Sequence, residues 1–193
     1  MSVYVARRAF AAACFFVLVL GGCASSPPRA KFAGSAAVNS VVLQANDTAA
    51  LAVSTAPGVT MADHERARLA DQIKTRLAAR QALNANAAEP RQYDIDVTVT
   101  RYEKGNAFAR AMMAGLGQIH LDALIKIFQT GSHTLLSEFS MDKTFAWGGI
   151  YGGTTSMGDI EGTFAEGIAN AMSGGEKEPK AGAAAERSAV SQK

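Results

Sequence analysis

The sequence predicts an α+β domain of two layers, in which two helices lie on one face of a mainly antiparallel sheet of about four strands. Two observations lead to this class. Three segments between residues 93 and 145 alternate apolar and polar side chains, as half-buried strands do. Two others, 60–83 and 159–172, repeat apolar residues with helical periodicity. Along the chain the predicted order is β-α-β-β-β-α. Strands that follow one another pair antiparallel, and a helix with one apolar face buries that face against a sheet, so these elements form two layers.

The predicted domain begins with a short strand and a long helix. Residues 40–45 carry three consecutive aliphatic side chains and precede Asn46-Asp47, which predicts a short buried strand followed by a turn. Thr60 and Asp63 form a pattern like a capping box, which predicts the helix start. The predicted helix has one apolar stripe, made of Ala62, Leu69, Ala70, Ile73 and Leu77.

Three strands and a helix complete the prediction. Along 93–101 and 118–128 every second residue is apolar, and 134–145 follows after Gly131-Ser132. The register that keeps apolar side chains together pairs Ile127 with Leu135 and centres the hairpin loop on Gly131. It also pairs Ile125 with Ser137, Ala123 with Phe139 and Leu121 with Met141. The last helix spans 159–172 and ends at Ser173-Gly174, a typical C-cap.

The first 22 residues have the features of an export signal. Arg7 and Arg8 precede an apolar run over 9–20, which at about 1.5 Å per residue reaches only about 18 Å and is too short to span a bilayer. Leu20-Gly21-Gly22-Cys23 resembles the lipobox of bacterial lipoproteins. That resemblance implies cleavage between Gly22 and Cys23 and lipid on the Cys23 sulfur, with the new amine acylated.

The position after the cysteine bears on localisation. In lipoproteins of this type aspartate there marks inner-membrane retention, so Ala24 predicts a periplasmic domain anchored to the outer membrane. The alternative is an ordinary secretory cleavage site at Gly22-Cys23-Ala24, which would give a soluble periplasmic protein. Cys14 lies in the signal and the Cys23 thiol is acylated, so we expect no disulfide.

The rest of the chain divides into a tether (23–37), a single domain (38–172) and a tail (173–193). Small and polar residues dominate both the tether and the tail, which predicts flexibility in the first and disorder in the second. Removing Arg7 and Arg8 with the signal leaves 17 basic and 17 acidic residues. Such a balance predicts no nucleic-acid partner.

A family resemblance rests on four features of the domain. They are Arg101-Tyr102-Glu103-Lys104-Gly105-Asn106 at a strand end, Gly115-Leu116-Gly117, a hairpin ending near Phe145, and glycines within 148–153. Together they resemble bacterial lipoproteins with the domain of unknown function DUF4410, over roughly residues 36–172. The resemblance implies an α+β fold and an envelope location, and it supplies no catalytic residue.

Only a few polar and glycine-rich positions of the domain are candidates for chemistry. Asp94 and Asp96 share a strand face and would form a divalent-metal site if they lay beside His120 and Asp122, but a solvated sheet face explains the same pattern. His64 and His133 fit ordinary surface positions. Residues 154–158 lack the glycine of a nucleophile elbow, and glycines 148, 149, 152, 153 and 158 fit no phosphate loop and predict a flexible connection. We therefore expect no catalytic residue, cofactor or metal.

Residues 107–116 are more apolar than a loop should be. We expect Phe108, Met112 and Leu116 to form a short helix packed on the domain's own core. The alternative is that they, with Met113 and with Trp147, Ile150 and Tyr151, are exposed as a partner- or membrane-facing patch.

The sequence thus predicts a lipid-anchored, non-enzymatic interaction or assembly-accessory lipoprotein with an envelope protein partner. The alternative is a lipoprotein that binds a small ligand or a divalent metal.

Overall fold

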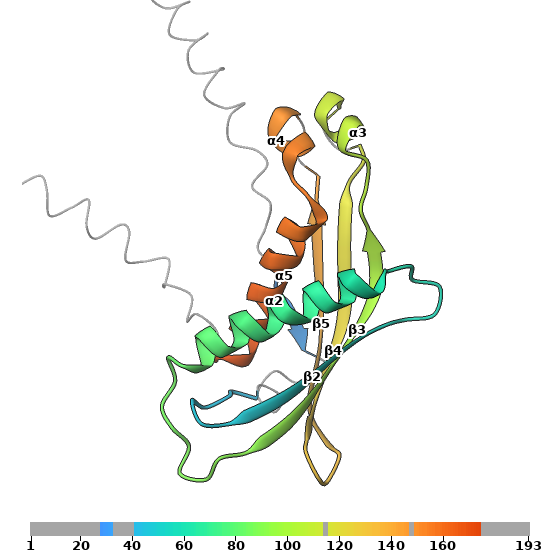
Figure 1. The fold of residues 1–193 in the computed structure, drawn as a ribbon. Coiled ribbons are helices and arrows are strands. Elements are labelled where there is room, and N and C mark those ends of the chain that lie inside the picture. The colour runs from blue at the N-terminus through green and yellow to red at the C-terminus, as the bar shows by residue number, and fades with distance from the viewer. Residues whose placement is uncertain (1–27, 33–40, 114–115, 147–148, 175–193) are drawn as a thin grey trace, which may run out of the picture.

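A computed structural model of the protein describes residues 28–32, 41–113, 116–146 and 149–174, and these form two layers (Figure 1). One layer is a five-stranded sheet, and helices α2 and α5 pack together on one of its faces. The elements are β1 (Ala30–Phe32), β2 (Thr48–Thr55), α2 (Asp63–Gln81), β3 (Gln92–Glu103), α3 (Ala107–Met112), β4 (Ile119–Gln129), β5 (Thr134–Phe145), α4 (Gly149–Thr154) and α5 (Met157–Met172). The predicted α+β class and its two layers are confirmed, with five strands instead of about four.

The strands lie in the order β1-β5-β4-β3-β2. Three neighbouring pairs are antiparallel, whereas β2 and β3 are parallel. The parallel pair follows from the chain order, because α2 connects these two strands and a strand-helix-strand connection returns the chain in the same direction. Both ends of the sheet are therefore edge strands, β1 at one side and β2 at the other.

The predicted strand at 40–45 is wrong. Residues 41–47 run as a link without strand pairing, and Leu43 is buried there: its N–H donates to the Met172 carbonyl (3.0 Å) and its carbonyl accepts from the Asn84 amide (2.6 Å). The first long strand is instead β2, which sequence reasoning missed.

The entry of the chain into the domain is fixed at β1, which lies within the segment predicted as a tether. Ala30 pairs with Met141 and Phe32 with Phe139 at the free side of β5. Just before β1, Pro28 packs on α5: a Cβ placed on Gly167 would lie 2.7 Å from the Pro28 ring. The contact leaves no room for a larger residue at position 167.

The alternation predicted for β3 and β4 is confirmed. Tyr93, Ile95, Val97 and Val99 are buried on β3, and Ile119, Leu121, Ala123, Ile125 and Ile127 are buried on β4. A bulge between Val99 and Arg101 shifts the pattern of β3, so Tyr102 also lies on the buried face.

The β4–β5 register differs from the prediction by two residues. Ile127 pairs with Ser137 and Leu121 with Lys143. One residue of this shift is already present at the hairpin end, where Gln129 pairs with Thr134, and an irregularity that leaves Leu136 as an extra residue in β5 adds the second. A shift of two keeps every inward residue inward, so the apolar pattern does not distinguish the two registers. Gly131 takes a left-handed conformation (φ 90°) in the loop, as predicted.

Both helix starts differ slightly from the prediction. Helix α2 is capped at Ala62, whose N–H donates to the Glu65 carboxylate (3.0 Å), and not by Thr60 and Asp63. Helix α5 begins at Met157, two residues before the predicted start, because Ser156 caps it and the Asp159 carboxylate accepts the Ser156 N–H (2.8 Å). These bonds hold the pKa of Asp159 below its usual value.

A buried carboxylate connects the two layers. Glu161 of α5 is fully buried and accepts hydrogen bonds from Arg68 of α2 (2.6 and 2.9 Å) and from the Tyr102 hydroxyl of β3 (2.6 Å). Burial, followed by this hydrogen bond, raises the pKa of Tyr102 well above its ordinary value. The sequence pattern carries no signal for this network, because its three residues lie 34 and 59 positions apart along the chain.

Several predicted features lie outside the described residues. They are the signal, Gly22, Cys23 and Ala24, most of the tether, Trp147, the side chains of Ile150 and Tyr151, and the tail after Gly174. Within the described ranges no helix is long and apolar enough to cross a bilayer.

Candidate interaction surfaces

The residues proposed for a metal site do not meet. Asp94 and Asp96 lie opposite Phe128 and Lys126, whereas Asp122 lies opposite Arg101. Four residues of strand separate Lys126 from Asp122, which corresponds to about 13 Å. Across the described ranges, no cluster of three or more acidic, histidine or cysteine side chains is placed to hold a metal ion.

The region around His120 is instead an exposed polar network. His120 Nδ1 contacts the Thr144 hydroxyl (3.0 Å), and its Nε2 lies 3.9 Å from the Glu103 carboxylate. Arg101 donates two hydrogen bonds to Glu103 (2.9 and 2.8 Å) and keeps the pKa of that carboxylate below its usual value. Burial raises the pKa of neighbouring Asp122. These contacts lie on the face of β4 opposite its buried residues, and His120 and Asp122 are half-buried there.

The glycine-rich connection before α5 is a helix and not the flexible segment that the sequence predicts. Residues 149–154 form α4, and Gly153 approaches α3 so closely that an added Cβ would lie 3.0 Å from the Ala111 methyl. The serine that follows, Ser156, is committed to capping α5. This segment therefore shapes the surface instead of supplying a nucleophile.

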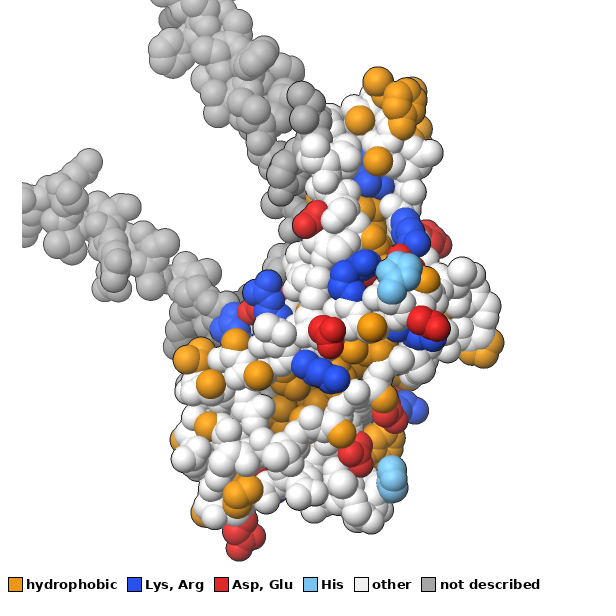
Figure 2. Space-filling model, viewed as in Figure 1, with side chains coloured by type: hydrophobic (Ala, Val, Ile, Leu, Met, Phe, Trp, Pro, Cys, Tyr) orange, Lys and Arg blue, Asp and Glu red, His pale blue; other side chains and the backbone are white. Residues whose placement is uncertain are grey.

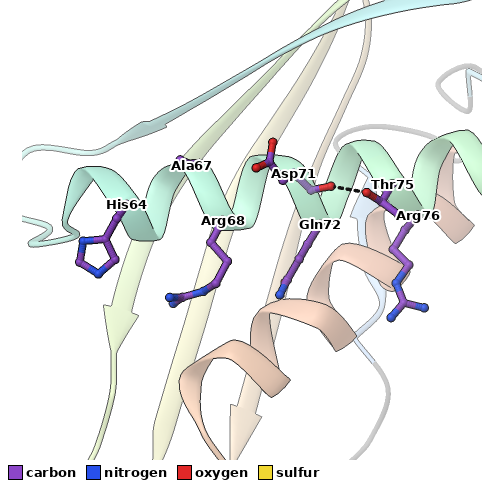
Figure 3. Close-up of a pocket in the computed structure, with 7 residues that line it drawn as sticks. All are labelled: His64, Ala67, Arg68, Asp71, Gln72, Thr75 and Arg76. Atoms are coloured by element: carbon purple, nitrogen blue, oxygen red, sulfur yellow. Dashed lines mark hydrogen bonds between the residues drawn. The ribbon is translucent and has the colours of Figure 1, made fainter.

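A shallow groove of about 540 Å³ follows α2. His64, Arg68, Gln72 and Arg76 project from α2 on the side that faces α5 (Figure 3). Arg68 is bound to Glu161, and Arg76 lies 3.5 Å from the Glu166 carboxylate, so both cations have acidic partners from α5. All seven residues that line the groove belong to α2, and both arginines among them are already paired with carboxylates of α5.

The α3–α4 end of the molecule is built around one buried arginine. Arg110 of α3 is only 3% exposed, and its guanidinium donates to four backbone carbonyls. These belong to Gly117 (2.8 Å), Gly152 (2.9 Å), Thr155 (3.0 Å) and Lys104 (3.2 Å). One side chain thus joins α3 to the end of β3, the start of β4 and α4. The apolar pattern of the sequence carries no signal for this role.

Two glycines let the chain close around α3. Gly105 and Gly117 both have positive φ (62° and 67°). A Cβ added at Gly105 would lie 2.2 Å from the Gly117 carbonyl oxygen, and one added at Gly117 would lie 2.3 Å from the Asn106 carbonyl oxygen. Asn106 begins the helix, since its side-chain oxygen accepts the Ala109 N–H (3.0 Å). The short helix predicted here is confirmed, and the contacts of Gly105, Asn106 and Gly117 define the position of its first turn.

The large apolar side chains of this helix and of the residues that follow it point outward, contrary to the expectation that they pack on the core. Phe108, Met112, Met113 and Leu116 are 71, 67, 59 and 52% exposed. We call these four residues the apolar tip; Figure 2 shows hydrophobic atoms gathered at this end of the molecule. Large apolar side chains this exposed, on an otherwise ordered base, are typical of a contact surface. The exposed-patch alternative is thus correct for these residues.

A second open surface is the outer edge of β2. This strand has eight residues, TAALAVST, with no charged side chain and no proline. Its inner edge pairs with β3 along the whole length, and it is the last strand of the sheet. Natural edge strands of this length usually carry charges or prolines that prevent pairing with another chain. The edge of β2 is therefore a surface on which an extended segment can pair.

The chain thus forms a small two-layer α+β domain with an apolar tip at one end and an uncharged strand at one edge. The chain belongs to the DUF4410 family, a domain of unknown function, whose model matches residues 36–149. This confirms the family that the sequence resembles. A search of curated proteins found no match.

Two solved structures share the fold. Both are PelC dodecamers from Paraburkholderia phytofirmans: a leucine-to-methionine point variant with TM-score 0.51 and 7% identity, and a second crystal form with TM-score 0.50 and 9% identity. Each comparison covers 75% of this chain and 97% of the other. At this identity the likeness concerns the fold alone.

Proposed function

We propose that this protein is a non-enzymatic lipoprotein of the bacterial envelope, held at the outer membrane by lipid on Cys23, with its domain in the periplasm. The lipobox-like sequence supports the anchor and Ala24 supports the outer membrane. In this proposal the domain binds an envelope protein, or a further copy of itself, by strand pairing at β2. The observation that carries the interaction role is the eight-residue edge strand without charge or proline.

Other observations support a binding role over catalysis. Ser156 caps a helix, Glu161 is enclosed by Arg68 and Tyr102, and the acidic strand residues lie apart from His120. The metal-binding alternative depended on that last juxtaposition. The dodecameric state of the two proteins that share the fold also favours protein contact as the role.

The anchor is tested by Cys23→Ala. Without the thiol there is no site for the diacylglyceryl group, so we expect loss of radiolabelled palmitate incorporation and accumulation of the precursor with its 22-residue signal. The wild-type protein, expressed at the same level, is the control. Labelling that persists in the variant would contradict lipidation at this residue.

The strand-pairing role is tested with a photo-crosslinking amino acid at Ala50, an exposed position of β2. We expect protein adducts in intact envelopes, and we expect Ala52→Lys to reduce them several-fold because a charged edge disfavours pairing. Ala79→Lys, the same change at an exposed site of α2, is the matched control and should leave the adducts unchanged. Equal yields with both lysine variants, or no adduct from Ala50, would refute the role of β2.

A further inference from the structure

We infer that the apolar tip is a second membrane contact, which lies in the head-group region of the same bilayer that holds the lipid on Cys23. This inference rests on the proposed lipidation and adds a surface and an occupant to it. It explains why four large apolar side chains are exposed on α3 and just after it, on a segment that Arg110 fixes to the rest of the domain.

The direction in which the chain enters the domain supports a bilayer at this end. Strand β1 is antiparallel to β5, so the residues that precede Ala30 come from the side where β5 ends at Phe145. That is also where α3 and α4 stand, beyond the ends of the strands (Figure 1). The packing of Pro28 on Gly167 fixes the point from which the tether leaves.

The length of the tether agrees with this placement. Ala30 lies opposite Met141, four residues before the end of β5, which is about 14 Å along the strand. One helix thickness of about 10 Å beyond the strand end brings the distance to the tip to about 24 Å. Seven residues separate Ala30 from Cys23, and they reach at most about 25 Å. A lipid on Cys23 therefore brings the bilayer to the level of the tip when the tether is extended along this direction.

The chemistry of this end also suits a bilayer. Neither 104–118 nor 146–158 contains an aspartate or glutamate, so no carboxylate would have to approach anionic head groups. Apolar side chains at such a surface bury themselves about 5–10 Å into the boundary between head groups and acyl chains. The cation at the base, Arg110, already has carbonyl partners and does not need water.

The experiment uses the acylated mature protein in vesicles of phosphatidylethanolamine and phosphatidylglycerol, with nitroxide-labelled lipids as quenchers. Because the Cys23 thiol is consumed by lipid, a cysteine at Met112 or at Leu135 can be labelled alone with an environment-sensitive fluorophore. Leu135 is the matched control: it is an exposed leucine, 47% accessible, at the hairpin end of β5. The 11 residues of β4 place that end about 35 Å from the strand end at which α3 stands, and the tip lies about 10 Å farther.

We expect strong quenching and a blue shift of the probe at Met112, no quenching at Leu135, and loss of the Met112 signal when Phe108→Asp is added. Protein that floats with the vesicles but shows no quenching at Met112, or equal quenching at both sites, would overturn the inference. A blue shift at Met112 without quenching would also overturn it, since a second copy would then cover the tip. Protein that does not float at all would indicate that the lipid anchor itself is missing, which would overturn the proposed function and this inference with it.

Discussion

The hydroxyl of Tyr102 should stabilise the domain through its bond to the buried Glu161 carboxylate, and Tyr102→Phe removes that bond alone. A hydrogen bond to a charged group contributes about 1.5–3 kcal/mol. Glu161 keeps its two bonds to Arg68 in the variant, so we expect a loss of about 2 kcal/mol in the free energy of unfolding. With a urea m-value of about 2 kcal/mol/M, the unfolding midpoint should fall by about 1 M.

A matched control is available on the same strand. Tyr93 is also buried, but its ring is held by the Arg91 guanidinium, 5.4 Å from the ring centroid, so Tyr93→Phe keeps the contact and should cost less than about 0.5 kcal/mol. A double-mutant cycle with Glu161→Gln isolates the charge. A bond to a neutral amide is worth about 1 kcal/mol, so Tyr102→Phe should cost about 1 kcal/mol less in that background.

The assay is urea unfolding of the mature chain, followed by tryptophan fluorescence and circular dichroism. Coincident transitions and an unchanged m-value would show that only stability has changed. Equal losses for the two tyrosine variants, or strictly additive effects in the cycle, would refute the assignment of stability to the Tyr102–Glu161 bond.

Three further predictions concern single residues. In Arg110→Lys the lysine cannot reproduce the four carbonyl contacts. Amide hydrogen exchange should therefore accelerate in 104–118 and 149–155 while the centre of β4 stays protected. Unchanged exchange at the α3–α4 end would contradict the role of Arg110. Gly117→Ala should lower the free energy of unfolding by well over the ~1 kcal/mol expected for Gly131→Ala. Both glycines have positive φ, but only at Gly117 would an added Cβ lie 2.3 Å from another atom. Equal urea midpoints for the two variants would refute this prediction. Two effects act on the pKa of Asp47. Burial raises it, but hydrogen bonds from the Gln44 and Arg91 backbone N–H groups and from the Arg91 side chain outweigh burial and hold the pKa below its usual value. This carboxylate therefore stabilises the fold above pH ~4 and loses that effect as the pH falls through the lowered pKa. Asp47→Asn should therefore cost more at pH 7 than at pH 3 in urea titrations, and an equal cost at both would contradict the linkage.

The parts of the fold that the sequence predicted are those where period and burial agree. On β3 and β4 every second residue is apolar and both strands lie under a helix layer, so the pattern directly reports the buried face. The striped face of α2, with Leu69, Ile73 and Leu77, was predicted for the same reason. In each case one physical effect, burial of one face, decides the structure.

The missed parts depend on effects that the pattern does not encode. Strand β2 is alanine-rich and exposed along much of its length, so its alternation is weak, whereas Val41, Val42 and Leu43 gave a stronger signal but lie in a link held by contacts with helix ends. The hairpin end and the bulge at Leu136 each move the β4–β5 register by one residue, and the resulting shift of two is one that apolar patterning cannot detect.

The candidate surfaces were harder to predict than the fold. The sequence singled out 107–116 as too apolar for a loop, but it favoured burial because apolar residues are usually inside. What turns Phe108 and Met112 outward is Arg110, which occupies the inner side of the short helix and is satisfied there by carbonyls. A buried arginine is uncommon enough that sequence reasoning assigns it to the surface by default.

The strand order has a consequence for how copies of the protein meet. The chain enters at β1, and the uncharged edge is β2, at the other end of the five-strand order; four spacings of about 4.8 Å separate them by about 19 Å. The lipid proposed on Cys23 would lie near the β1 edge, so it would leave the unpaired backbone of β2 at the opposite edge sterically unobstructed by the anchor. Diffusion confined to a plane would then present these margins to neighbours sideways, so that association can proceed laterally without any copy leaving the membrane.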